Sequence, residues 1–129
     1  MKSACELCFL HPGITLKYCA ASLSSLSDGV FMPNEVRLVV MINTQPGKGL
    51  QQLAAFQALA PKVRAEHGCL NYDLHPVVGN PDSFVLIEKW ASKAALDAHH
   101  VAPHMVEAAQ HNPSFRAGPA TVLLLEDAV

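Results

Sequence analysis

The residues best suited to chemistry in this sequence lie between positions 88 and 104. Glu88 and Trp90, the only tryptophan, are two positions apart at the end of an apolar run. Three histidines follow within fifteen positions of the tryptophan: His99, His100 and His104. Carboxylates and imidazoles can take up and release protons, and an imidazole titrates close to neutral pH. We therefore expect proton-transfer chemistry to be concentrated in this segment.

The elements that position these residues can be inferred from the local pattern. Alternation over 82–90 predicts a strand with Leu86, Glu88 and Trp90 on one face. Ser92 is a suitable N-cap for the helix that follows. Pro103 restricts the preceding residue to extended geometry, so this helix is expected to break there and to restart with proline in its first turn.

Each candidate also has a plain structural role. His104 lies at the helix break, where a pocket can open, and is our first choice as a base; a hydrogen bond at a helix start is the alternative. His99, on the expected inner helix face, is the second choice, and His100 is expected to face solvent. Glu88 is costly to bury unless it is paired, so it could orient a histidine or form a structural hydrogen bond.

A metal site is not expected. His100 and His104 have a spacing of four, which suits an ion on an unbroken helix, but Pro103 interrupts that geometry. The pair Cys5 and Cys8 has zinc-like spacing without a second pair.

Composition narrows the class of protein. The chain has 129 residues, half of them apolar, a formal charge of −2 and a pI near 6.4. This predicts one compact domain and argues against nucleic acid as the main partner. Its four cysteines do not resemble a disulfide framework, so we expect a reduced, cytoplasmic setting without membrane association. Residues 1–31 lack a clear period and are expected to be a disordered or artefactual extension of a domain spanning 32–129.

Hydrophobic patterning predicts the order β-α-β-β-α-β. The economical fold is a ferredoxin-like α+β subunit, with a four-stranded antiparallel sheet and both helices on one face. Because the strands carry apolar residues on both faces, the uncovered face should pack against a second copy as a homodimer. The expected strands are 35–43, 69–76, 82–90 and 120–126, and the expected helices are 50–66 and 92–110, the second broken at Pro103.

Residues 35–126 also resemble the antibiotic-biosynthesis monooxygenase superfamily, especially its quinol-monooxygenase-like group. The resemblance rests on His67-Gly68-Cys69-Leu70-Asn71-Tyr72, within the family's Glu-x-Gly-Cys-x-x-Tyr region, on Phe84-Val85-Leu86-Ile87-Glu88-Lys89-Trp90, and on the stretch from His99 to Met105. It implies a dimeric α/β barrel of ferredoxin-like subunits.

The resemblance further implies a small monooxygenase that needs no cofactor. Such an enzyme binds an aromatic or quinol-like molecule, removes a phenolic proton and lets the substrate itself reduce O2. Alternatives within the same fold are an isomerase, a haem-degrading relative and a non-catalytic ligand-binding or stress-response dimer. The resemblance suggests catalytic roles for His104, His99 and Glu88. It suggests substrate-binding roles for Trp90, Tyr72, Asn43 and Leu86.

Overall fold

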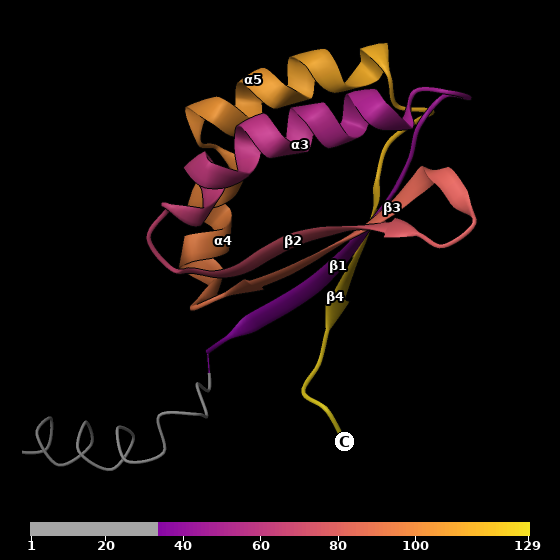
Figure 1. The fold of residues 1–129 in the computed structure, drawn as a ribbon. Helices are drawn as coiled ribbons and strands as arrows, with labels where there is room; N and C mark the ends of the chain where they lie inside the picture. The colour runs from indigo at the N-terminus through magenta and orange to yellow at the C-terminus, as the bar shows by residue number, and fades with distance from the viewer. Residues whose placement is uncertain (1–33) are drawn as a thin grey trace, which may run out of the picture. The chain divides into compact units, whose positions relative to one another are not determined.

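The computed structural model describes residues 34–129, so the expectations for residues 1–31 lie outside the described part of the chain. The predicted order of elements and the ferredoxin-like fold are confirmed (Figure 1). The elements are β1 (Val36–Asn43), α3 (Gly49–Arg64), β2 (Cys69–Val77), β3 (Asn80–Trp90), α4 (Lys93–His100), α5 (Pro103–His111), a 3-10 turn (Asn112–Ser114) and β4 (Thr121–Leu125).

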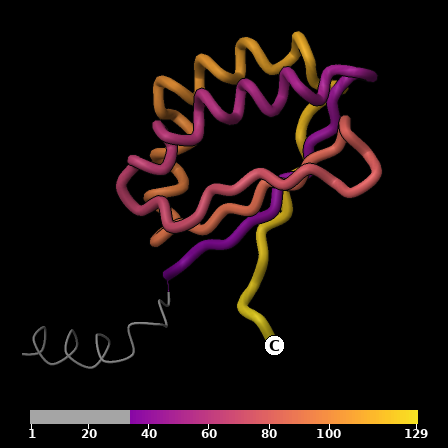
Figure 2. The backbone as a smooth tube through the Cα atoms, viewed as in Figure 1, coloured from indigo at the N-terminus to yellow at the C-terminus, as the bar shows by residue number. Residues whose placement is uncertain are grey.

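The four strands form one antiparallel sheet in the order β2-β3-β1-β4. Helices α3 and α5 contact each other and lie on the same side of the sheet, running in opposite directions (Figure 2). The C-terminal end of α3 therefore lies near the start of α5. This arrangement brings residues from the two helix ends together above the strands.

The sheet has one covered face and one open face. The side chains of Leu38, Val40 and Ile42 alternate along β1 and are buried beneath the helices with those of β3. The open face is also apolar: Met41, Ile87, Leu123 and Leu125 keep 41%, 42%, 46% and 48% of their surface exposed. Large apolar side chains on both faces agree with the sequence pattern.

Helix α3 continues through Pro61 and ends at Arg64, two residues before the expected end at residue 66. Gly68 follows with φ +87°, which glycine adopts without strain. A Cβ at this glycine would lie 2.6 Å from the Cβ of Ala95 on α4. Gly68 therefore lets the turn after α3 approach α4 closely.

The predicted break between α4 and α5 is confirmed. Ser92 Oγ accepts a hydrogen bond from the backbone N–H of Ala95 at 3.1 Å, which caps α4. Ala102 adopts an extended conformation and Pro103 begins α5. His104 therefore lies in the first turn of a new helix.

The other end of α3 is held by the β3 carboxylate of Asp82. Its two oxygens accept hydrogen bonds from the backbone N–H groups of Gly47 and Gly49 at 2.9 and 3.0 Å. These hydrogen bonds hold the pKa of Asp82 below its usual range, and the bond from Gly47 has the largest effect. A Cβ at Gly49 would lie only 2.0 Å from the Pro81 carbonyl oxygen, so this helix start is closely packed against the β2–β3 hairpin.

Candidate active site

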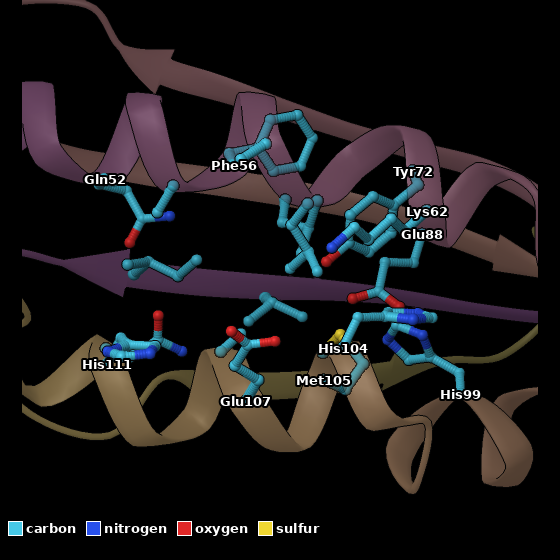
Figure 3. A pocket seen from close by; sticks show the side chains of 18 of the residues that line it. Gln52, Phe56, Lys62, Tyr72, Glu88, His99, His104, Met105, Glu107 and His111 are labelled. Atoms are coloured by element: carbon cyan, nitrogen blue, oxygen red, sulfur yellow. The ribbon is translucent and has the colours of Figure 1, made fainter.

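A cavity of about 450 Å³ lies between the covered face of the sheet and helices α3 and α5 (Figure 3). Its floor is apolar and comes from β1 and β3, including Leu38, Val40 and Leu86. Polar side chains gather at its two ends. In Figure 3, His99, His104, Glu88 and Tyr72 lie at one end, and Gln52 and His111 lie at the other.

At the first end, a single carboxylate lies between two imidazoles. Glu66 Oε2 is 2.6 Å from His104 Nε2 and 3.0 Å from His99 Nδ1. The imidazoles line the cavity, whereas Glu66 lies behind them with its side chain 14% exposed. An ionised carboxylate only accepts hydrogen bonds, so it selects the tautomer of each ring that has a proton on the facing nitrogen.

Local structure explains how Glu66 reaches both rings. It lies in the turn after α3, where its backbone N–H donates to Val63 O and its carbonyl accepts from Cys69 N–H. This turn lies beside α4, which carries His99, and beside the start of α5, which carries His104. The Pro103 break was therefore a correct guide to where His104 lies.

Glu88 and Trp90 form a second pair at the same end. Trp90 Nε1 donates a hydrogen bond to Glu88 Oε1 at 2.9 Å, and both side chains are buried. Burial raises the pKa of Glu88 above its usual range. Glu88 lines the cavity, but Trp90 lies behind it, with its ring centroid 4.6 Å from that of His99.

Two stacked rings, one from α3 and one from β2, form part of the cavity wall. The centroids of Phe56 and Tyr72 are 5.4 Å apart with nearly parallel planes, and both residues line the cavity. Burial raises the pKa of Tyr72, so its phenol remains protonated and can donate a hydrogen bond. Desolvation also raises the pKa of Cys69, which disfavours its thiolate.

Two expectations from the sequence, those for Asn43 and Trp90, differ from the structure. Asn43 lies on the open face, because the strand alternation that directs Ile42 to the cavity directs its neighbour away; its side-chain oxygen accepts a hydrogen bond from Ser83 Oγ at 2.6 Å. Trp90 is not part of the cavity wall, since Glu88 and His99 lie between its ring and the cavity. His100 is exposed to solvent, as expected, and also lines the cavity.

Three further residues were missed. No role was predicted from the sequence for Glu66 or Gln52, yet Glu66 bridges the histidines and Gln52 is only 3% exposed. Glu66 occupies the first position of the Glu-x-Gly-Cys-x-x-Tyr motif, and Gln52 is one turn before Phe56; either pattern could have identified it. Arg116 lines the cavity from a loop, where no periodicity signals its direction.

Among residues 34–129, no group of histidine, cysteine, aspartate and glutamate side chains has the arrangement of a metal site. In the same part of the chain, none of the helices has the length and apolar character needed to span a bilayer.

Comparison with known proteins now identifies the family. The sequence model described as antibiotic biosynthesis monooxygenase matches residues 35–111. The chain belongs to this family. It is 38% identical over 80 residues to the probable quinol monooxygenase YgiN of Escherichia coli, which covers 53% of this chain and 75% of that protein. This family membership supports a small monooxygenase-like protein.

Other relatives fit the same assignment. The uncharacterized protein sll1783 of Synechocystis is 31% identical over 81 residues, 63% of this chain, and the match spans only 55% of that relative's length. The crystal structure of PA3566 from Pseudomonas aeruginosa superposes with a TM-score of 0.70 at 28% identity, covering 77% of this chain and 99% of PA3566.

Proposed function

We propose that this protein is a cofactor-independent monooxygenase that oxidises a hydroquinone-like aromatic molecule with O2. The observation that carries the proposal is the placement of Glu66 behind two cavity-lining imidazoles, at the polar end of an otherwise apolar cavity. A base held in one tautomer beside an apolar slot is what removal of a phenolic proton requires.

His104 is the proposed base. Its Nε2 faces the Glu66 carboxylate, which leaves Nδ1 as the nitrogen able to accept a proton. The carboxylate then stabilises the imidazolium that forms, as a buried acid does in hydrolase triads. His99 shares the carboxylate and is the alternative acceptor.

The remaining groups act on the substrate ring and its charge. The stacked Phe56 and Tyr72 supply a flat wall, and Leu86 supplies part of the apolar floor. The Tyr72 hydroxyl can donate a hydrogen bond to a phenolate oxygen, and Glu88, whose pKa is raised by burial, lines the same end of the cavity. Trp90 and Glu66 contribute as positioning residues.

The balanced reaction is hydroquinone plus O2 giving hydroxyquinone plus water. One oxygen atom enters the ring and the other leaves as water. Deprotonation makes the ring electron-rich, so that the substrate provides all the electrons needed to reduce O2.

The test is O2 uptake with a panel of hydroquinones in air-saturated buffer. Wild-type protein is expected to raise the rate above background, and His104→Ala should lower kcat by about 100- to 10,000-fold. His67→Ala is a matched control, because this imidazole is exposed and outside the cavity. No uptake above background with any quinol contradicts the proposal; ligand binding without uptake favours a non-catalytic ligand-binding protein.

We also propose a cytoplasmic homodimer that packs through the open face of the sheet. The exposed apolar side chains of Met41, Ile87, Leu123 and Leu125 support it, since such a surface is costly in water. Light scattering at micromolar concentration should give twice the subunit mass for wild type. Ile87→Lys, in the middle of this face, should give monomers, and a monomeric wild type would contradict the dimer.

A further inference from the structure

The end of the cavity opposite His99 and His104 holds a cation, Arg116, for which the described part of the chain supplies no acidic partner. Arg116 Nε donates a hydrogen bond to the side-chain oxygen of Gln52 at 2.9 Å. Among residues 34–129, no carboxylate oxygen lies within 4 Å of the Arg116 guanidinium. A neutral amide thus occupies the position in which a buried arginine usually meets a carboxylate.

Arg116 is held firmly in this position. Its backbone N–H donates to Asn112 O at 2.9 Å, and its carbonyl accepts from Gln45 Nε2 at 3.1 Å. A bridge to Thr44 fixes the same segment to the end of β1. Gln52 is itself buried at the start of α3. The arginine is therefore pre-organised rather than a mobile surface side chain.

The terminal nitrogens of the guanidinium are available to a ligand. The hydrogen bond to Gln52 uses Nε, and no described side chain or carbonyl accepts from Nη1 or Nη2. In the described residues, no fully buried side-chain nitrogen or oxygen lacks a partner, so these two nitrogens are accessible. Since Arg116 lines the cavity, it can present a fork of N–H donors there.

We propose that Arg116 binds a carboxylate of the substrate, which makes the substrate an aromatic acid. This inference rests on the proposed function and specifies its substrate class. The planar fork of an arginine matches a carboxylate, and such charge-assisted pairs are stronger away from bulk water. Gln52 strengthens the site by holding the guanidinium without neutralising it.

The geometry gives the substrate one orientation. Gln52 precedes Phe56 by four residues, about one helical turn or 5.4 Å, the scale of a single aromatic ring. The Phe56–Tyr72 wall thus lies between the arginine and the histidines, and Tyr72 also contacts His99 at 5.8 Å between centroids. An acid bound to Arg116 would place its ring on this wall and its far phenol toward His104.

Other charges along the cavity do not compensate Arg116. His111 on α5 lies at the same end of the cavity as Gln52, and Lys62 on α3 and Glu107 on α5 also line the cavity; all three side chains are exposed to solvent. Solvent screens them more effectively than a half-buried guanidinium. Of the two cations that line the cavity, Arg116 is the one held in place by a buried partner.

The test compares binding of 2-naphthoate and 2-naphthamide by calorimetry with the full chain. These ligands differ in charge and cannot undergo hydroquinone oxidation, so binding is measured independently of the proposed reaction. Wild type is expected to bind the acid at least tenfold more tightly than the amide. Arg116→Gln should abolish this preference and leave the affinity for the amide within threefold.

Gln52→Glu is the sharper variant, because it keeps Arg116 and nearly the same shape but supplies an internal carboxylate. Gln52→Glu should also abolish the preference for the acid over the amide. It therefore tests the proposal even if Arg116→Gln does not fold. Lys93→Gln removes a positive charge from α4, outside the cavity, and should retain the full preference.

The outcomes separate this inference from the proposed function. Equal affinity for acid and amide in wild type, or a preference that survives in both Arg116→Gln and Gln52→Glu, overturns the inference even if hydroquinones are oxidised. A preference lost in these variants but kept in Lys93→Gln supports it even if no hydroquinone is oxidised.

Discussion

The two ends of the cavity differ in whether their charged groups have partners within the protein. At one end the Glu66 carboxylate is fully engaged by His99 and His104, within the protein. At the other end the Arg116 side chain meets, among the described residues, the neutral Gln52 and no carboxylate. A group whose partners are internal is suited to moving protons, whereas a cation left uncompensated is suited to binding an anion from outside. The same cavity thus separates chemistry from recognition.

The largest effect is expected from disrupting the internal pair. Glu66→Gln preserves shape but removes the charge that stabilises an imidazolium, so kcat should fall by about 100- to 1,000-fold. KM should change little, because Glu66 does not line the cavity. Steady-state O2 uptake gives both parameters. A rise in KM at constant kcat would show that Glu66 acts on binding instead.

The next largest effect is expected at the end of the cavity that holds Arg116. With a hydroquinone that carries a carboxylate, Gln52→Glu should raise KM by about 10- to 100-fold and leave kcat within threefold, because the new carboxylate competes for Arg116. The neutral amide of the same hydroquinone is the internal control, and its KM should not rise. An equal rise for both substrates would indicate general damage to the cavity.

The turn that carries Glu66 can be tested through stability. Gly68→Ala places a Cβ 2.6 Å from that of Ala95 and forces a positive φ on alanine, so the free energy of unfolding should fall by about 1–3 kcal/mol. Gly79→Ala is the matched control, with a similar φ of +81° but open space around it. Chemical denaturation measures both. Equal losses would mean that backbone strain, not contact with α4, explains the cost.

The smallest effect is a change in how stability depends on pH. Burial raises the pKa of Glu88 in the folded state above its usual value of 4.5. Its contribution is therefore fully present below pH 4.5 and is lost as pH rises through the folded pKa. Glu88→Gln should remove this loss, so the variant should become more stable relative to wild type as the pH rises above 4.5. Parallel pH curves for the two proteins would contradict a raised pKa.

Sequence patterns predicted the fold well because the strands alternate cleanly and Pro103 interrupts the second helix. They also predicted that His104 would lie at that interruption. They failed where direction depends on tertiary contacts. Asn43 was assigned to the cavity although its strand neighbour Ile42 already occupies that face, and Trp90 was assigned to the wall although Glu88 lies in front of it.

The missed residues show why the remaining part of the site was not predictable. A charged residue near the end of a helix, such as Glu66, is usually solvated, and only the three-dimensional meeting of α3, α4 and α5 brings it to two imidazoles. Arg116 lies in a loop, where no period relates position to direction. Its isolation from carboxylates is a property of the folded chain alone.

The most direct test of the division between the two ends is a double comparison. O2 uptake is measured with 2,5-dihydroxybenzoate and its amide, in wild type, His104→Ala and Arg116→Gln. His104→Ala should lower kcat for both substrates, and Arg116→Gln should raise KM for the acid alone. If both variants change the same kinetic parameter for both substrates, the two ends are not functionally distinct and the account is contradicted.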